Sequence, residues 1–233
     1  GPALADKGLV LSGGLMAIAA HLTPFSKTSF VQSLGVSGKD VDMTWQNLRL
    51  SQARGAMRFT PPHGFALSSF SARALGGILN ITDFRTDNKG DATLQISLSD
   101  ADLSDVTRFL GVRGLYLTGT GAADIPITYH AGEPFVSGAA HLTGTNGALS
   151  YAPVTYPDYL VGRAPQRKAL RTALQNFQFD SLGLTAQPVK GGLQGALTLT
   201  GQAPDLYGAQ DVSLKVEGSG AVPAALDQIL PRL

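Results

Sequence analysis

The chain has 233 residues, of which 43% are hydrophobic and only 15% are charged, and its formal net charge is +1. It contains no cysteine, which excludes disulfide scaffolds, thiolate metal sites and cysteine nucleophiles. The near-neutral charge also argues against a general nucleic-acid-binding protein, because such proteins carry a basic stripe and an extreme pI.

Alternating apolar residues predict β-strands along most of the chain, separated by turns rich in glycine, asparagine and aspartate. The apolar run at 15–20 is too short for a membrane-spanning helix and indicates a strand. Strands are expected near 9–22, 43–50, 56–59, 65–72, 76–84, 135–143 and 148–151. The fold class is therefore mainly β.

Four further segments alternate most clearly, and each places its apolar residues on one face of a strand. These residues are Leu94, Ile96 and Leu98; Ile125, Ile127 and Tyr129; Leu193, Leu197 and Leu199; and Val212, Leu214 and Val216. We expect the four apolar faces to line one continuous interior surface. A second packed sheet, a closed barrel or a bound lipid would each cover such a surface, and the alternation alone does not choose among them.

In two places the apolar residues change from odd to even positions. Met43 and Trp45 are followed by Leu48 and Leu50, and Phe177 and Phe179 are followed by Leu182 and Leu184. A change of this kind within a strand predicts a β-bulge. Together with 28 glycines and few charges, these bulges favour a strongly curved antiparallel sheet.

Helical spacing of apolar residues predicts three short helices, at 102–111, 164–177 and 222–233. The second helix is basic on the side away from its apolar stripe. Its cations are Arg163, Arg167, Lys168 and Arg171, with no acidic residue between Asp158 and Asp180. Such a helix fits anionic lipid headgroups, although a solvated face whose cations pair with acids elsewhere explains the same pattern.

Catalytic motifs are absent. Residues 119–124 and 218–223 imitate the start of a dinucleotide-binding fingerprint, but both lack its third glycine. The histidines His21, His63, His130 and His141 are scattered and have no further ligands at metal-site spacing. We therefore expect no enzymatic activity, no cofactor and no metal site.

Residues 109–153 and 168–219 resemble the C-terminal region of the AsmA-like proteins of Gram-negative envelopes, and most closely the YdbH family. The matching pattern contains glycine and proline positions where strands begin, a glycine-to-tyrosine strand and the end of a helix. These positions are Gly76, Gly77, Gly114, Gly119, Pro126, Gly147, Tyr151, Leu174 and Phe177.

The resemblance implies a U-shaped sheet, the repeating β-groove or β-taco, whose apolar concave face carries phospholipid acyl chains between the inner and outer membranes. It implies a periplasmic location at the outer-membrane end, with the full-length protein anchored in the inner membrane by a segment absent from this sequence. It also implies an outer-membrane lipoprotein partner, YnbE in this family, that adds a strand to the sheet edge.

No linker interrupts the chain, so residues 1–233 are expected to form one β-groove unit, with residues 160–176 as its internal seam. The edge for strand addition is expected at Val212 to Gly218 or near Leu9 to Leu15. An alternative function is a structural adaptor whose sheet edge recruits the lipoprotein without carrying lipid.

Overall fold

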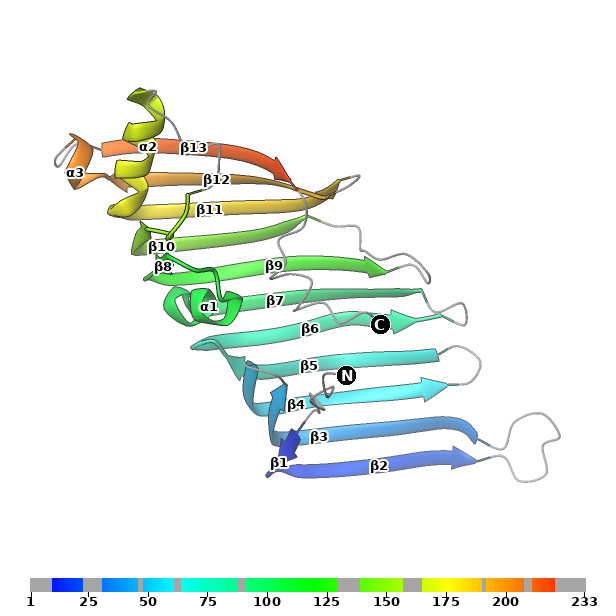
Figure 1. Ribbon diagram of the computed structural model, residues 1–233. Helices are drawn as coiled ribbons and strands as arrows, with labels where there is room; N and C mark the ends of the chain where they lie inside the picture. The colour runs from blue at the N-terminus through cyan, green and yellow to red at the C-terminus, as the bar shows by residue number, and fades with distance from the viewer. Residues whose placement is uncertain are drawn as a thin grey trace, which may run out of the picture. The chain divides into compact units, whose positions relative to one another are not determined.

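The computed structural model describes residues 10–22, 31–45, 48–60, 64–87, 91–129, 139–156, 165–189, 192–207 and 211–220, most of which lie in strands (Figure 1). By its contacts the chain divides into two compact units. The first contains residues 1–99 and 124–138, and the second contains residues 100–123 and 139–233. Helix 165–175 lies within the second unit, and a seam at 160–176 stays a prediction.

Thirteen strands in the described part of the chain form one antiparallel sheet. They are β1 Val10–Ser12, β2 Leu15–Leu22, β3 Val31–Trp45, β4 Leu48–Thr60, β5 Gly64–Ala74, β6 Gly77–Thr86, β7 Ala92–Asp102, β8 Leu115–Leu117, β9 Thr120–Tyr129, β10 Ala140–Tyr151, β11 Phe177–Val189, β12 Gly192–Gln202 and β13 Asp211–Gly220. Their order is β1-β3-β4-β5-β6-β7-β9-β10-β11-β12-β13, with β2 also paired to β3 and β8 to β10.

This order is linear, so the sheet is open. The prediction of a mainly β fold built on a large antiparallel sheet is confirmed, and an open sheet is consistent with the groove that the resemblance implies. Most strands pair with the next strand along the chain, as alternating strands joined by short turns should.

The predicted bulge between Phe179 and Leu182 is present, because the β11–β12 register shifts between Phe179 and Ser181. On the other side of β11, Asn146 of β10 has a positive φ of 50°. Asparagine adopts this left-handed conformation more readily than most residues. Both strands therefore change the face that their side chains occupy, and Phe177 and Leu182 join one core.

The other predicted bulge, between Met43 and Leu50, is wrong. These residues belong to two strands of a hairpin, in which Met43 pairs with Leu50 and Trp45 pairs with Leu48. Paired residues share a face, so the change of parity arises from the turn rather than from an irregular strand.

Bulges do occur farther along the same pair of strands. The β3–β4 register shifts on both sides of Val41, and Asp40 of β3 and Gln52 of β4 have positive φ values of 56° and 54°. Side chains stabilise the distortion: Arg54 Nε donates to Asp40 Oδ1 at 2.9 Å and Arg73 Nε donates to Gln52 Oε1 at 2.8 Å.

Most of β3 was not predicted. Residues 31–42 contain Gly35, Gly38 and several polar residues, so they show no clear alternation, yet they form a long strand that pairs with both β2 and β4. Pairing with a strand on each side stabilises β3, although its own sequence lacks the alternation of a strand.

Two of the predicted helices are confirmed, as α1 Leu103–Leu110 and α2 Pro165–Gln175, and both belong to the second unit. The helix predicted at 222–233 lies outside the described residues. A single-turn helix, α3 Pro204–Tyr207, follows β12 and was not predicted. Figure 1 shows α2 crossing the strands at the end where β11 begins and β12 ends.

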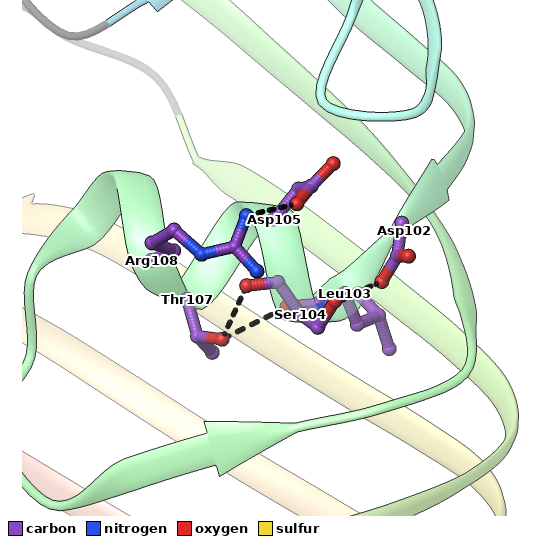
Figure 2. A network of polar contacts seen from close by, with 6 residues as sticks. All are labelled: Asp102, Leu103, Ser104, Asp105, Thr107 and Arg108. Atoms are coloured by element: carbon purple, nitrogen blue, oxygen red, sulfur yellow. Dashed lines mark hydrogen bonds and ion pairs between the residues drawn. The ribbon is translucent and has the colours of Figure 1, made fainter.

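The ends of α1 follow ordinary capping rules. Asp102 Oδ1 accepts hydrogen bonds from the Ser104 backbone N–H at 2.8 Å and from the Ser104 hydroxyl at 2.6 Å (Figure 2). At the other end Gly111 has a left-handed φ of 63° and donates its N–H to the Thr107 carbonyl oxygen at 3.1 Å. These bonds satisfy backbone groups that a helix end leaves without partners.

Each unit has its own apolar cluster. In the first unit the cluster is small and consists of Val41, Leu50, Ala53, Ala72 and Ala74. The second unit has a larger core, built by the strands, by α1 and by α2. Its buried members are Leu103, Leu117, Leu149, Ala173, Leu174, Phe177, Phe179, Leu182, Leu199 and Ala203.

Candidate functional site

The strands of the first unit form a two-faced surface, and one face is apolar. Directly paired residues of antiparallel strands share a face, so the printed registers trace rows of side chains across the sheet. One row crosses six strands, from β2 to β7: Met16, Gly38, Gly55, Phe70, Ile81 and Ile96. It contains no charged residue.

Two further apolar rows run beside it over β2 to β5. They are Ile18, Val36, Met57 and Leu67, and Ala20, Leu34, Phe59 and Phe65. The rings of Phe59 and Phe65 lie with their centroids 4.7 Å apart. We call the side of the sheet that carries these three rows the apolar face of the first unit.

Much of this apolar face is exposed. The exposed fraction is 71% for Ile18, 54% for Met16 and 43% for Phe65. All the described helices belong to the second unit. Large contiguous apolar surfaces are rare on soluble monomers and usually mark a place where something binds.

The opposite face of the same strands is polar. Arg58 of β4 pairs with Ala66, which pairs with Arg85 of β6, and Ser71 pairs with Asn80, which pairs with Ser97. The sheet of the first unit therefore separates an apolar side from a solvated side, as its period of two requires.

Three of the residues predicted to line a groove lie on the apolar face of the first unit. Ile96 pairs with Ile81 and Leu98 pairs with Leu79. Leu94 follows Thr93, which pairs with Arg85 on the polar face, so strand alternation places Leu94 on the apolar face. Leu94 and Ile96 are half-buried, and Leu98 is buried.

The residues predicted on β9 are less fully described. Ile125 and Ile127 are half-buried and share one face of β9, a neighbour of β7 in the sheet. Tyr129 ends β9, and the surroundings of its side chain lie outside what the structure describes.

In the second unit the registers bring most of the predicted residues into two adjacent rows. The outer row is Leu142, Leu184, Leu197 and Val216, which pair in succession from β10 to β13. The inner row is Gly144, Leu182, Leu199 and Leu214, which pair in the same way. Leu193 pairs with Pro188 and with Gly220, and Val212 pairs with Gly201.

The two rows differ in burial on β10, β11 and β12, whereas on β13 Leu214 and Val216 are both half-buried. Leu199 is 0% exposed and Leu182 is 3% exposed, whereas Leu184 in the outer row is 37% exposed. Leu197, Val212 and Leu214 are partly buried and pack against the core of the second unit. Leu182 and Leu199 of the inner row thus lie within a core filled by protein side chains.

The predicted basic residues lie on α2 and just before it. Arg167 and Lys168 are exposed, and Arg171 is half-buried with its guanidinium carbon 5.8 Å from the centroid of the Tyr156 ring. The opposite side of α2 contributes Ala173 and Leu174 to the core. Arg163 lies outside the described residues.

The electrostatics of the described residues are mild. The Ser104 hydroxyl and backbone N–H hold the pKa of Asp102 below its usual value of 3.8. On β13, Lys215 and Glu217 form an exposed ion pair at 2.7 Å, and this mutual hydrogen bond raises the pKa of Lys215 and lowers that of Glu217. Neither arrangement creates a general acid or base.

Within the described part of the chain, no group of three or more histidine, aspartate or glutamate side chains is placed to hold a metal ion. None of the helices among these residues is long and apolar enough to cross a membrane.

The sequence alone did not identify several residues of the apolar face. Met16, Ile18, Val36, Met57 and Phe70 belong to it, but the alternation of each strand does not reveal which residues of different strands pair. A prediction of the β3–β4 and β4–β5 hairpins with their bulges would have been needed to find them.

Comparison with known families agrees with these surfaces. The model of the YdbH-like family, described as intermembrane phospholipid transport protein YdbH, matches residues 30–224, which is most of the chain. No curated protein and no solved structure matched the chain.

Proposed function

The chain belongs to the YdbH-like family of intermembrane phospholipid transport proteins, and from this we propose that it carries phospholipid with the acyl chains lying on the apolar face of its strands. Transport between two membranes implies a periplasmic location, and phospholipid is the cargo of the family. Transport, rather than catalysis, is what the family does.

The observation that carries this proposal is the uncharged row from Met16 to Ile96, which crosses six strands of the first unit. An acyl chain placed on such a row replaces water against both surfaces, and each buried methylene contributes about 0.8 kcal/mol. A headgroup can remain in water at the margin of the face, because the face is exposed rather than enclosed.

The finer parts of the proposal concern orientation in the envelope. The chain forms the outer-membrane end of a protein that is anchored in the inner membrane. The cations of α2, together with Arg163, contact anionic headgroups while Ala173 and Leu174 attach the helix to the second unit.

Lipid extraction and native mass spectrometry of the purified chain test the proposal. We expect co-purified phospholipid, and we expect Ile96→Asp to lose it because a carboxylate on the apolar face must be desolvated under an acyl chain. Gln95→Asp is the matched control, since Gln95 is the preceding residue and pairs with Thr82 on the polar face. An empty wild-type protein, or equal loss in both variants, would contradict lipid carriage.

A second candidate function is an adaptor that recruits an outer-membrane lipoprotein by strand addition. It is favoured by β13, which ends the strand order, pairs with β12 on one side and contains no proline from Asp211 to Gly220. Exposed edges of this kind accept a further strand unless charge or proline blocks them. An adaptor would purify without lipid, and a folded Leu214→Pro variant would lose its partner.

A further inference from the structure

We infer that α1 and α2 form a fixed wall that restricts acyl chains in the second unit to the outer row of Leu142, Leu184, Leu197 and Val216. This inference rests on the proposed function and adds a boundary to it. The buried part of the inner row, Leu182 and Leu199, is then a structural core that lipid does not enter, although these residues are as apolar as those of the outer row.

Burial distinguishes the two rows. Leu182 and Leu199 of the inner row belong to the same buried cluster as Leu103 of α1 and Leu174 of α2. The outer row lies two residues away from the inner row along each strand, and its residue Leu184 is exposed. A lipid methylene can reach Leu184 without displacing protein.

At the start of α1, the Leu103 side chain packs against two glycines, Gly121 of β9 and Gly144 of β10. A Cβ atom at Gly121 would lie 2.5 Å from Leu103 Cδ2, and one at Gly144 would lie 2.8 Å from Leu103 Cδ1. Both distances are too short for carbon atoms, so the Leu103 side chain occupies space that only glycine leaves open.

The backbone fixes the same residue. The Leu103 N–H donates to the Gly119 carbonyl oxygen at 3.0 Å, and Asp102 caps the helix through Ser104 (Figure 2). Leu103 is 0% exposed. The packing of the Leu103 side chain, its backbone hydrogen bond and the Asp102 cap thus fix the start of α1. Leu103 is the positioning residue that sets the boundary of the acyl-chain surface.

A phospholipid with a photoactivatable diazirine in its acyl chain tests this boundary. The full chain is mixed with vesicles that contain this lipid and is illuminated, and labelled residues are identified by peptide mass spectrometry. We expect label on Leu184, Leu197 and Val216, and at least about tenfold less on Leu182 and Leu199, because a close-packed core excludes the probe. Equal labelling of the two rows would overturn the inference and leave the proposed function intact.

Truncation of the wall provides the second arm. In Leu103→Ala, with the fold checked by circular dichroism, label should extend to Leu182 and Leu199. Val106→Ala is the matched control, because Val106 is also a buried residue of α1 but is not part of the buried cluster around Leu199. A folded Leu103→Ala protein with the wild-type labelling pattern would overturn the role of Leu103. If the variant does not fold, the wild-type pattern still decides the boundary.

Labelling of neither row, and of no residue of the first unit, would instead contradict the proposed function itself. Labelling of the first unit together with an unlabelled second unit would show that lipid does not reach the outer row, which also overturns the inference. The outcomes therefore separate a failure of the boundary from a failure of lipid carriage.

Discussion

Gly147 shows how closely the backbones approach one another in the second unit. Thr118 and Ala148 are joined by two hydrogen bonds, from the Thr118 N–H to the Ala148 carbonyl oxygen at 2.9 Å and from the Ala148 N–H to the Thr118 hydroxyl at 3.0 Å. A Cβ atom at Gly147 would overlap the Thr118 carbonyl oxygen and the ring of Phe179. Backbone atoms cannot move aside as a flexible side chain can.

Gly147→Ala should therefore destabilise the chain by about 3 kcal/mol or more, at or above the upper end for overpacked sites. Chemical denaturation, followed by tryptophan fluorescence and circular dichroism, measures the change. Gly183→Ala is the control, because a Cβ atom at Gly183 would meet no atom within 4 Å, and it should stay within about 0.5 kcal/mol of wild type. Equal effects of the two substitutions would refute the steric argument.

Asp102 gives a pH dependence whose sign follows from its hydrogen bonds. The Ser104 hydroxyl and N–H stabilise the carboxylate and hold the pKa of Asp102 below 3.8 in the folded chain. A depressed folded pKa adds stability above the unfolded pKa, and this stability is lost as the pH falls through the folded pKa.

Asp102→Ala should lower stability by about 1 kcal/mol at neutral pH, the usual effect of losing a helix N-cap. The difference between the two proteins should remain constant above about pH 5 and shrink as the pH falls below the ordinary range of an aspartate. Denaturation midpoints measured from pH 3 to pH 7 check this. A difference that grows toward low pH would show that the cap does not act through the ionised carboxylate.

At the scale of elements, α2 has two sides with separate tasks. Ala173 and Leu174 are buried in the core, whereas Arg167 and Lys168 are exposed and Arg171 stacks near Tyr156. The helix has no acidic residue in its first turn. Ala173 and Leu174 therefore attach the helix to the core of the second unit.

Changing Arg167, Lys168 and Arg171 to glutamine should weaken binding to anionic vesicles by roughly tenfold to a hundredfold at low salt, since each cation near such a surface contributes about 1 kcal/mol. Wild-type binding should also fall as salt is added. Vesicle co-sedimentation measures both effects. The control changes Arg49, Arg58 and Arg85, three exposed cations of the first unit, to glutamine. Salt-independent binding, or an equal loss in the control, would refute contact between α2 and headgroups.

The elements also show what the sequence could predict. Strands with strict alternation, such as β7 and β12, and helices with clear caps, such as α1, were found from their own residues. The polar and glycine-rich β3 was mostly missed, because its stability comes from pairing with β2 and β4 rather than from its own pattern. Alternation likewise placed Leu197 and Leu199 on one face but could not reveal that Leu199 is fully buried in the core whereas Leu197 is only partly buried.

The glycines of the family pattern are explained at this scale too. Gly114 and Gly119 have positive φ values of 77° and 106°, and a Cβ atom at either would lie under 3.0 Å from a backbone oxygen of the β10 region. These positions require glycine for steric reasons, so a pattern that was matched as sequence corresponds to the close packing of β8, β9 and β10.

At the scale of the whole molecule, the linear strand order has a consequence for how such a protein can change in length during evolution. Neighbours in the sheet are mostly neighbours in sequence, and among the described strands no pairing joins β1 to β13. Duplication of one hairpin would thus extend the sheet without altering the registers of the other strands. Each added hairpin widens the sheet by about 10 Å in the hydrogen-bonding direction, since adjacent strands are about 4.8 Å apart. The distance that such a protein spans would then change in steps of one hairpin.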